Sequence, residues 1–231
     1  MTENAEKVLS LRYVDFINAK YNSNLKIVPK SQSRLMKVLG PILRLFNKNF
    51  DDYNTTIGST MYIPERNLLP EADQVAVTEV YMHESVHAFD NKRLGAKGLV
   101  FKAAYLFPQI LALLSLLATA AFFASNLWLL WLLALLFLAP IPAYFRMRLE
   151  VRGYKTSTML ANYLYDLKTL EQQKFIRDMV VEQLTTGLYY WCWPFASQID
   201  KHMKDQSFLN EEPYTAMKEF VDANMLLPKN S

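Results

Sequence analysis

The sequence contains a single cysteine, Cys192, in 231 residues. A lone cysteine excludes an intramolecular disulfide and a cysteine-rich metal site, and the composition is consistent with a reducing compartment. The N-terminal residues are polar and lack the basic and apolar segments of a secretory signal. We therefore expect residues 1–102 to remain in the compartment where they are made.

Neither sign of charge is in large excess. The chain has 25 basic and 22 acidic residues, for a net charge of +3, with 52% hydrophobic and 20% charged residues. This balance argues against the clustered basic face of a nucleic-acid-binding protein, so no nucleic-acid partner is expected. The hydrophobic content excludes a disordered chain.

Charge is completely missing from residues 103–145, which contain no Asp, Glu, Lys, Arg or His. Two apolar runs, 103–124 and 127–145, are each close to the roughly 20 residues that cross a bilayer. Ser125 and Asn126 between them favour a tight turn. A pair of buried core helices is the alternative, but such helices normally keep a polar face. The segment therefore predicts a two-helix transmembrane hairpin.

Basic residues flank this segment on both sides. They are Lys92, Arg93, Lys97 and Lys102 before it, and Arg146, Arg148, Arg152 and Lys155 after it. Because positive residues stay on the cytoplasmic side of a membrane, we expect an integral membrane protein whose soluble parts are both cytoplasmic. The lipid bilayer is thus an expected partner.

Hydrophobic periodicity outside this segment is mostly helical. Helical patterns cover residues 5–20, 31–48, 71–91, 146–165, 170–190 and 214–225. Pro70 and Glu71 are expected to open the third of these helices. Residues 25–28 favour a short strand, and residues 53–63 favour a strand or a small hairpin that turns near Gly58. The predicted fold class is α+β, mostly helical, with a small sheet.

Histidine is scarce, and two of the three histidines lie in one short motif, His83-Glu84-Ser85-Val86-His87. Residues four apart on a helix share a face, so His83 and His87 are spaced to hold one Zn²⁺. Zinc lowers the pKa of a bound water, and Glu84 beside the histidines is then the predicted general base. The alternative interpretation is an ordinary surface helix that carries two histidines.

A catalytic zinc site needs a third protein ligand and an open position. Asp90 and Arg93 stand where an HExxHxxGxxH motif would have its glycine and its third histidine, which excludes that motif. A glutamate on a later helix is the remaining common solution, and Glu150 is the predicted ligand. The competing interpretation is an ion pair between Glu150 and Arg146. The alternative third ligands are Asp90, Asp166 and His202.

These motifs resemble those of the gluzincin metallopeptidases, and most of all the HtpX-like membrane proteases and their CAAX prenyl protease relatives. In that family an HExxH helix is followed by a transmembrane hairpin and then by a helix with the glutamate ligand. The motif at His83, residues 103–145 and Glu150 match this order, so the resemblance covers about residues 55–165. It implies a minimal zincin-like domain with an edge strand, here residues 57–63, that binds an extended substrate peptide.

A gluzincin also needs a hydrogen-bond donor for the oxyanion that develops during hydrolysis. Tyr154 is the residue predicted for this role. The alternatives are Arg152, Tyr189, Tyr190 and His202.

Three parts of the chain are expected to have separate roles. Residues 1–102 carry the edge strand and the HExxH helix, residues 103–145 form the hairpin, and residues 146–231 form a helical part with the third zinc ligand. The predicted function is a membrane-anchored zinc endopeptidase that cleaves membrane-associated protein or peptide substrates near the cytoplasmic surface. The alternatives are a membrane-anchored scaffold with an inactive zincin-like domain, and a zinc hydrolase of a non-peptide amide or ester.

Overall fold

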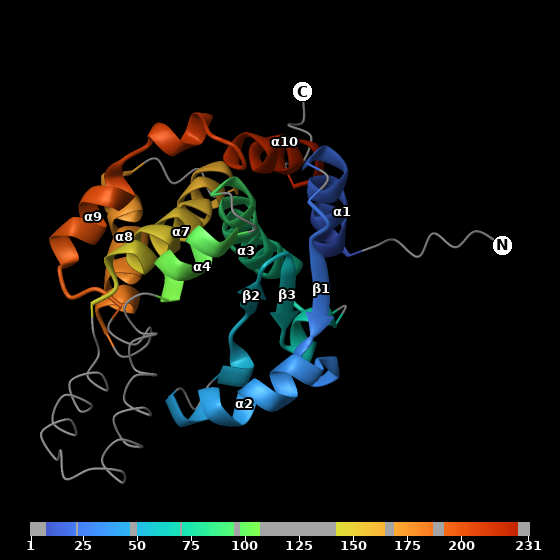
Figure 1. The fold of residues 1–231 in the computed structure, drawn as a ribbon. Coiled ribbons are helices and arrows are strands. Elements are labelled where there is room, and N and C mark those ends of the chain that lie inside the picture. Colours follow the sequence, from blue (N-terminus) through green and yellow to red (C-terminus); the bar gives the residue numbers. More distant parts are fainter. Residues whose placement is uncertain are drawn as a thin grey trace, which may run out of the picture. The chain divides into compact units, whose positions relative to one another are not determined.

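The computed structural model of the chain describes eight segments. They are residues 8–21, 23–46, 50–69, 71–94, 98–106, 142–164, 169–186 and 192–225. These segments form a mostly helical α+β fold with one small sheet, shown in Figure 1. The mostly helical composition and the small sheet agree with the predicted patterns of hydrophobic residues.

The sheet has three strands, β1 (Lys26–Pro29), β2 (Thr55–Ile57) and β3 (Thr60–Ile63). β2 and β3 form a hairpin, which is the second of the two alternatives predicted for residues 53–63. Gly58 takes a positive φ of 65° in the turn, a conformation that glycine adopts without a steric penalty. β3 also pairs in parallel with β1, so β3 is the central strand (Figure 1). The prediction that residues 57–63 form an edge strand is therefore wrong, because β2 takes the edge position.

In the sequence, β1 is preceded by α1 (Leu9–Tyr21) and followed by α2 (Arg34–Phe46). α2 contains Pro41, as expected. α3 (Gln74–Arg93) carries the His-Glu-x-x-His motif. The predicted opening at Pro70 and Glu71 is wrong. The carboxylate of Asp73 accepts hydrogen bonds from the backbone N–H groups of Val75 and Ala76, in the first turn of α3, at 3.0 and 3.1 Å. This side-chain cap sets the start of the helix at Gln74.

The later helices are α4, α7, α8, α9 and α10. Their bounds are Leu99–Leu106, Tyr144–Leu164, Leu170–Thr185, Ala196–Lys204 and Tyr214–Asn224. Short 3-10 helices occur at Lys30–Gln32, Phe50–Asp52, Glu65–Leu68 and Ser207–Asn210. Thr169 and Gln172 form a reciprocal capping box that begins α8. α9 was not expected from the sequence.

The transmembrane hairpin expected at residues 103–145 requires a correction. Most of it, residues 107–141, lies outside the described residues. Across the segments that the structure does describe, no helix is long and apolar enough to span a bilayer. α4 has 8 residues, about 12 Å, against about 30 Å of hydrocarbon. α7 is long enough but carries charged residues such as Arg146 and Glu150. The same finding contradicts the predicted integral-membrane localisation.

The chain divides into two compact units. One comprises residues 1–93, 155–166 and 207–231, and the other comprises residues 94–154 and 167–206. α7 is continuous from one unit into the other. The three predicted parts, 1–102, 103–145 and 146–231, remain a prediction about roles.

The core of the first unit is formed by α1, β3, α3, the end of α7 and α10. Tyr13 of α1 is fully buried, and its ring meets Phe220 of α10 edge-on at 5.2 Å. Tyr81 and Met82 of α3 are also fully buried. Each such side chain contributes about 1.5–3 kcal/mol of hydrophobic stabilisation. This packing anchors α3 in the core, while a motif histidine on the same helix, His83, is half-buried.

The core of the second unit is formed by the start of α7, by α8 and by α9. Met147 and Leu184 are fully buried there, next to Cys192. Burial raises the pKa of the Cys192 thiol to about 12. Cys192 is therefore a protonated thiol at neutral pH and packs as a small apolar side chain.

Candidate metal centre

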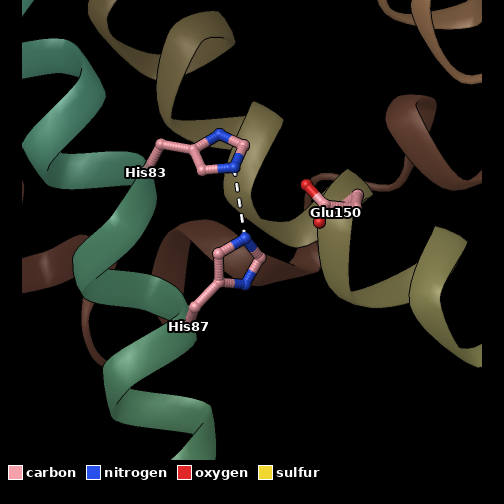
Figure 2. A group of neighbouring side chains, drawn as sticks. All are labelled: His83, His87 and Glu150. Carbon is pink, nitrogen blue, oxygen red and sulfur yellow. Dashed lines mark hydrogen bonds between the residues drawn. The ribbon is translucent and has the colours of Figure 1, made fainter. Parts of the chain in front are cut away.

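The two motif histidines lie one turn apart on α3 and face the same way. Figure 2 shows both rings projecting from one side of the helix toward Glu150. Their Nε2 atoms are 3.2 Å apart, and the rings are nearly perpendicular, at 77°. His87 is only 5% exposed and His83 is half-buried. The helical period alone brings the two nitrogens together, as the spacing predicted.

Glu150 of α7 completes the group. One potential ligand atom from each of His83, His87 and Glu150 lies within 4.8 Å of the other two. The Glu150 side chain is fully buried. Further along α7, Met159 and Leu160 pack in the same core as α3. They follow Glu150 by two to three helical turns.

The donor set fits zinc in type and in spacing. Two imidazole nitrogens and one carboxylate oxygen are ligands that Zn²⁺ takes in catalytic sites. Nitrogens bound about 2.0–2.1 Å from one tetrahedral ion stand roughly 3.3 Å apart. The 3.2 Å between His83 and His87 is close to this value. For the whole group, including the Glu150 carboxylate, the ligand atoms lie within 4.8 Å of one another.

Glu84 lies next to His83 in the motif and is tied to the sheet. The Thr56 hydroxyl on β2 donates a hydrogen bond to the Glu84 Oε2 atom. β2 is an edge strand, and it packs against α3. The predicted general base and the edge strand are therefore neighbours, although the strand is β2 and not the predicted 57–63 segment.

A buried hydrogen bond from α1 also holds the motif. The hydroxyl groups of Tyr13 and Ser85 are 2.7 Å apart, and Ser85 donates to the Met82 carbonyl at 2.8 Å. Since Ser85 uses its proton in that second bond, Tyr13 is the donor in the first. Burial raises the pKa of Tyr13 well above its usual range, so this donor keeps its proton at neutral pH.

Glu150 has its own hydrogen-bond donor. The Tyr105 hydroxyl of α4 donates to the Glu150 Oε1 atom. The Tyr105 ring stacks on Phe101 with centroids 5.8 Å apart, and the Arg146 guanidinium lies 5.0 Å from the centre of the Tyr105 ring. The Glu150 carboxylate thus accepts a hydrogen bond from an uncharged phenol, and the Tyr105 ring is in contact with Phe101 and Arg146.

Lys30 places a buried ammonium group near the base. Burial lowers the pKa of Lys30 to about 8, while the carboxylates of Asp51, Glu84 and Asp52 act in the opposite direction. Lys30 donates to the Phe50 carbonyl and lies 3.8 Å from the centre of the Phe50 ring. Lys30 therefore contributes positive charge close enough to Glu84 for the two groups to interact electrostatically.

Two of the three alternative third ligands, Asp90 and His202, are described by the structure, and neither belongs to the group. Asp90 is buried on α3, three residues after His87, and the group of converging donors does not include it. His202 lies on α9, with its ring 6.4 Å from the Tyr144 ring. Asp166 lies outside the described residues.

Two of the residues predicted for the oxyanion, Tyr154 and Arg152, lie on α7 close to Glu150. Tyr154 lies one turn after Glu150 on α7, is half-buried and packs against the core of the second unit. Arg152 is half-buried on the same helix. Tyr189 and Tyr190 lie outside the described residues. The role of Tyr154 stays a prediction.

Three residues near the site were not expected from the sequence: Thr56, Tyr105 and Lys30. Each is far in sequence from the carboxylate that it faces, and no local pattern marks it. The packing of β2 against α3 brings Thr56 to Glu84, and α4 brings Tyr105 to Glu150. Lys30 comes from the 3-10 helix that follows β1.

Comparison with known proteins adds no relative. No protein family, curated protein or solved structure matches the chain. The resemblance to gluzincins therefore depends on the motif and on the three converging side chains.

Proposed function

We propose that this chain is a zinc-dependent hydrolase of the gluzincin type, which cleaves peptide bonds in protein or peptide substrates. The observation that supports the proposal most is the convergence of His83, His87 and Glu150, whose ligand atoms lie within 4.8 Å of one another. The general base of such an enzyme, Glu84, lies in the same motif. A degenerate site often loses this base, and the chain retains it.

The three side chains would hold the ion as two neutral imidazoles and one carboxylate. Burying a carboxylate as completely as Glu150 is costly, and a divalent cation beside it would offset that cost. When bound, zinc polarises a carbonyl oxygen and makes water a stronger acid. The remaining functions of the site belong to the side chains of the chain itself.

Glu84 would take a proton from the attacking water and return it to the leaving amine. The first transfer makes the water a nucleophile, and the second allows the C–N bond to break. Thr56 donates to Glu84 Oε2 and so limits the rotation of the carboxylate, whose other oxygen is the one we assign to the proton. A carboxylate held in one orientation needs less reorganisation to reach the transition state.

A peptide is the substrate class that the surroundings of Glu84 favour. The strand that contacts Glu84, β2, is an edge strand of three residues, Thr55–Ile57. An extended chain pairs with such an edge through backbone hydrogen bonds, largely independent of its sequence. A bound peptide on β2 would therefore lie beside the base.

The test combines metal content with hydrolysis. Zinc is measured by mass spectrometry on the purified full chain and on Glu84→Gln, and cleavage is followed on labelled casein, on a mixed peptide library and on p-nitrophenyl acetate. We expect near-stoichiometric zinc in both proteins. Cleavage by Glu84→Gln should fall by about 10²–10⁴-fold, because the base is lost and the ligands remain. The matched control is Glu182→Gln, an exposed glutamate on α8, which should cleave as the parent does.

Two results would contradict the proposal. Absence of zinc in the parent after reconstitution would remove the metal site. Equal cleavage by the parent and Glu84→Gln would remove Glu84 from the chemistry. If the chain cleaves p-nitrophenyl acetate and leaves every peptide intact, it is a hydrolase whose substrate is a non-peptide ester or amide.

A further inference from the structure

We infer that Tyr105 is a positioning residue for the metal centre, acting through its hydrogen bond to the carboxylate of Glu150. This inference rests on the proposed function, because it requires Glu150 to be a ligand. Tyr105 is assigned no contact with substrate. Its role is to restrict Glu150 to the orientation in which one carboxylate oxygen is available to the ion.

The hydrogen bond is well suited to this role. Tyr105 donates to Glu150 Oε1, and a carboxylate has a second oxygen that can bind a metal ion. Ligating carboxylates in metal sites are usually hydrogen-bonded in this way, and loss of the partner typically weakens metal binding about 10–100-fold. A phenol brings no charge, so it fixes the carboxylate without neutralising it. A lysine or arginine in the same place would compete with the cation.

Tyr105 is itself held in place. Its ring stacks on Phe101, four residues earlier on α4, with an interplanar angle of 21°. The Arg146 guanidinium lies 5.0 Å from the ring centre, and Arg146 is one turn before Glu150 on α7. The Tyr105 ring contacts Arg146 and its hydroxyl donates to Glu150, so both contacts are with one turn of α7. A donor restrained in this way lowers the conformational entropy that Glu150 would lose on binding an ion.

The substitution Tyr105→Phe separates this role from packing. It removes the hydroxyl and keeps the ring, so the stacking on Phe101 and the contact with Arg146 remain. A matched control is Tyr144→Phe, which removes a hydroxyl at the start of α7, where the ring packs against Trp193 at 5.2 Å. Thermal unfolding of both metal-free variants checks that each retains the fold of the parent.

The experiment measures the dissociation constant for Zn²⁺ by competition with a fluorescent chelator, on the full chain. We expect a dissociation constant about 10–100-fold larger for Tyr105→Phe than for the parent, and an unchanged value for Tyr144→Phe. The visible absorption spectrum of bound Co²⁺ is the second readout. It should change in Tyr105→Phe, because the orientation of a ligand oxygen changes, and a merely structural role would leave it unchanged.

The outcomes separate this inference from the function on which it rests. A parent that binds no Zn²⁺ overturns the proposed function. A parent that binds Zn²⁺, with the same dissociation constant and the same Co²⁺ spectrum in Tyr105→Phe, overturns only the role of Tyr105. Unchanged metal binding with slower peptide cleavage in Tyr105→Phe also overturns it, since the hydroxyl would then act on the substrate and not on Glu150.

Discussion

The two helices that supply the candidate ligands, α3 and α7, differ in how their ligands are specified. α3 carries His83 and His87 in a five-residue motif, and the helical period by itself brings their Nε2 atoms to 3.2 Å. α7 carries one ligand, Glu150, and nothing in its own sequence fixes where that carboxylate lies. Adjacent ligands need only a helix, whereas a lone ligand needs the tertiary structure.

The polar contacts of the two helices follow the same division. On α3, Tyr13 holds Ser85 and Thr56 holds Glu84, so α1 and β2 attach to positions inside the motif. On α7, the donor to Glu150 comes from Tyr105 of α4. Substitutions on each helix should therefore affect different properties: stability and catalysis for the contacts of α3, and metal affinity for those of α7.

The largest expected effect is the loss of metal from either helix. His87→Ala and Glu150→Ala should each reduce zinc from near-stoichiometric to a small fraction, because two ligands hold zinc far less firmly than three. Zinc content after dialysis measures this. Asp90→Asn is the matched control on α3 and should retain zinc. Zinc retained in Glu150→Ala, and lost in His87→Ala, would mean that the third ligand is another residue.

The lowered pKa of the buried Lys30 predicts that the free energy of unfolding depends on pH. The pKa of Lys30 is about 8 in the folded chain and about 10.4 in an unfolded chain. Between these values only the unfolded chain holds the proton, so stability should rise from about pH 8 to pH 10, by at most about 3 kcal/mol. Urea unfolding at several pH values measures the rise.

Lys30→Met is the variant that tests this assignment, because it should flatten the rise between pH 8 and 10. An equal rise in the variant would assign the effect to other groups. Above pH 10 the trend should reverse. Burial raises the pKa of Tyr13 and Tyr81, which keep their protons in the fold while tyrosines in the unfolded chain ionise. Stability should then fall with pH.

The hydrogen bond between α1 and α3 should matter for stability and little for metal affinity. Tyr13→Phe should lower the free energy of unfolding by about 1–2 kcal/mol, since it leaves the buried Ser85 oxygen without its donor. Denaturant unfolding of the metal-free protein measures this. Zinc affinity should stay within about 3-fold of the parent value. A larger loss of zinc affinity would show that the histidines depend on α1 and not on the helical period alone.

The smallest expected effect is that of Thr56 on β2. Thr56→Val keeps the shape and removes the donor to Glu84, so kcat for peptide cleavage should fall about 2–10-fold, with KM and zinc affinity nearly unchanged. Thr56→Ser restores the hydroxyl and should recover most of the rate. A change in KM instead would assign Thr56 to substrate binding.

Sequence reasoning predicted the local features best. The hairpin at Gly58 and the helices α1, α2, α8 and α10 were visible in periodicity and turn residues, because these features depend on neighbours in the chain. The start of α3 was wrong by a few residues, since Asp73 provides a better cap than the predicted opening. The edge strand was assigned to the wrong half of the hairpin, because the pairing of β3 with β1 is a long-range contact.

The charge-free segment shows the limit of composition as a guide. Its apolar character predicted two spans at residues 103–145, yet no helix in the described ranges is long and apolar enough to cross a membrane. Most of the segment, residues 107–141, lies outside the described residues, so this finding concerns the helices that the structure describes.

The sequence by itself determined the helical spacing of His83 and His87 and the presence of Glu84 between them, because these depend on a period of 3.6 residues. It also led to the prediction of Glu150, on a later helix, as the third ligand. Only the tertiary structure decided that Glu150 lies within reach of the histidines, that Tyr105 donates to it and that Thr56 donates to Glu84. Each of these contacts joins elements that are distant in the chain, and such contacts are set by packing and not by local periodicity.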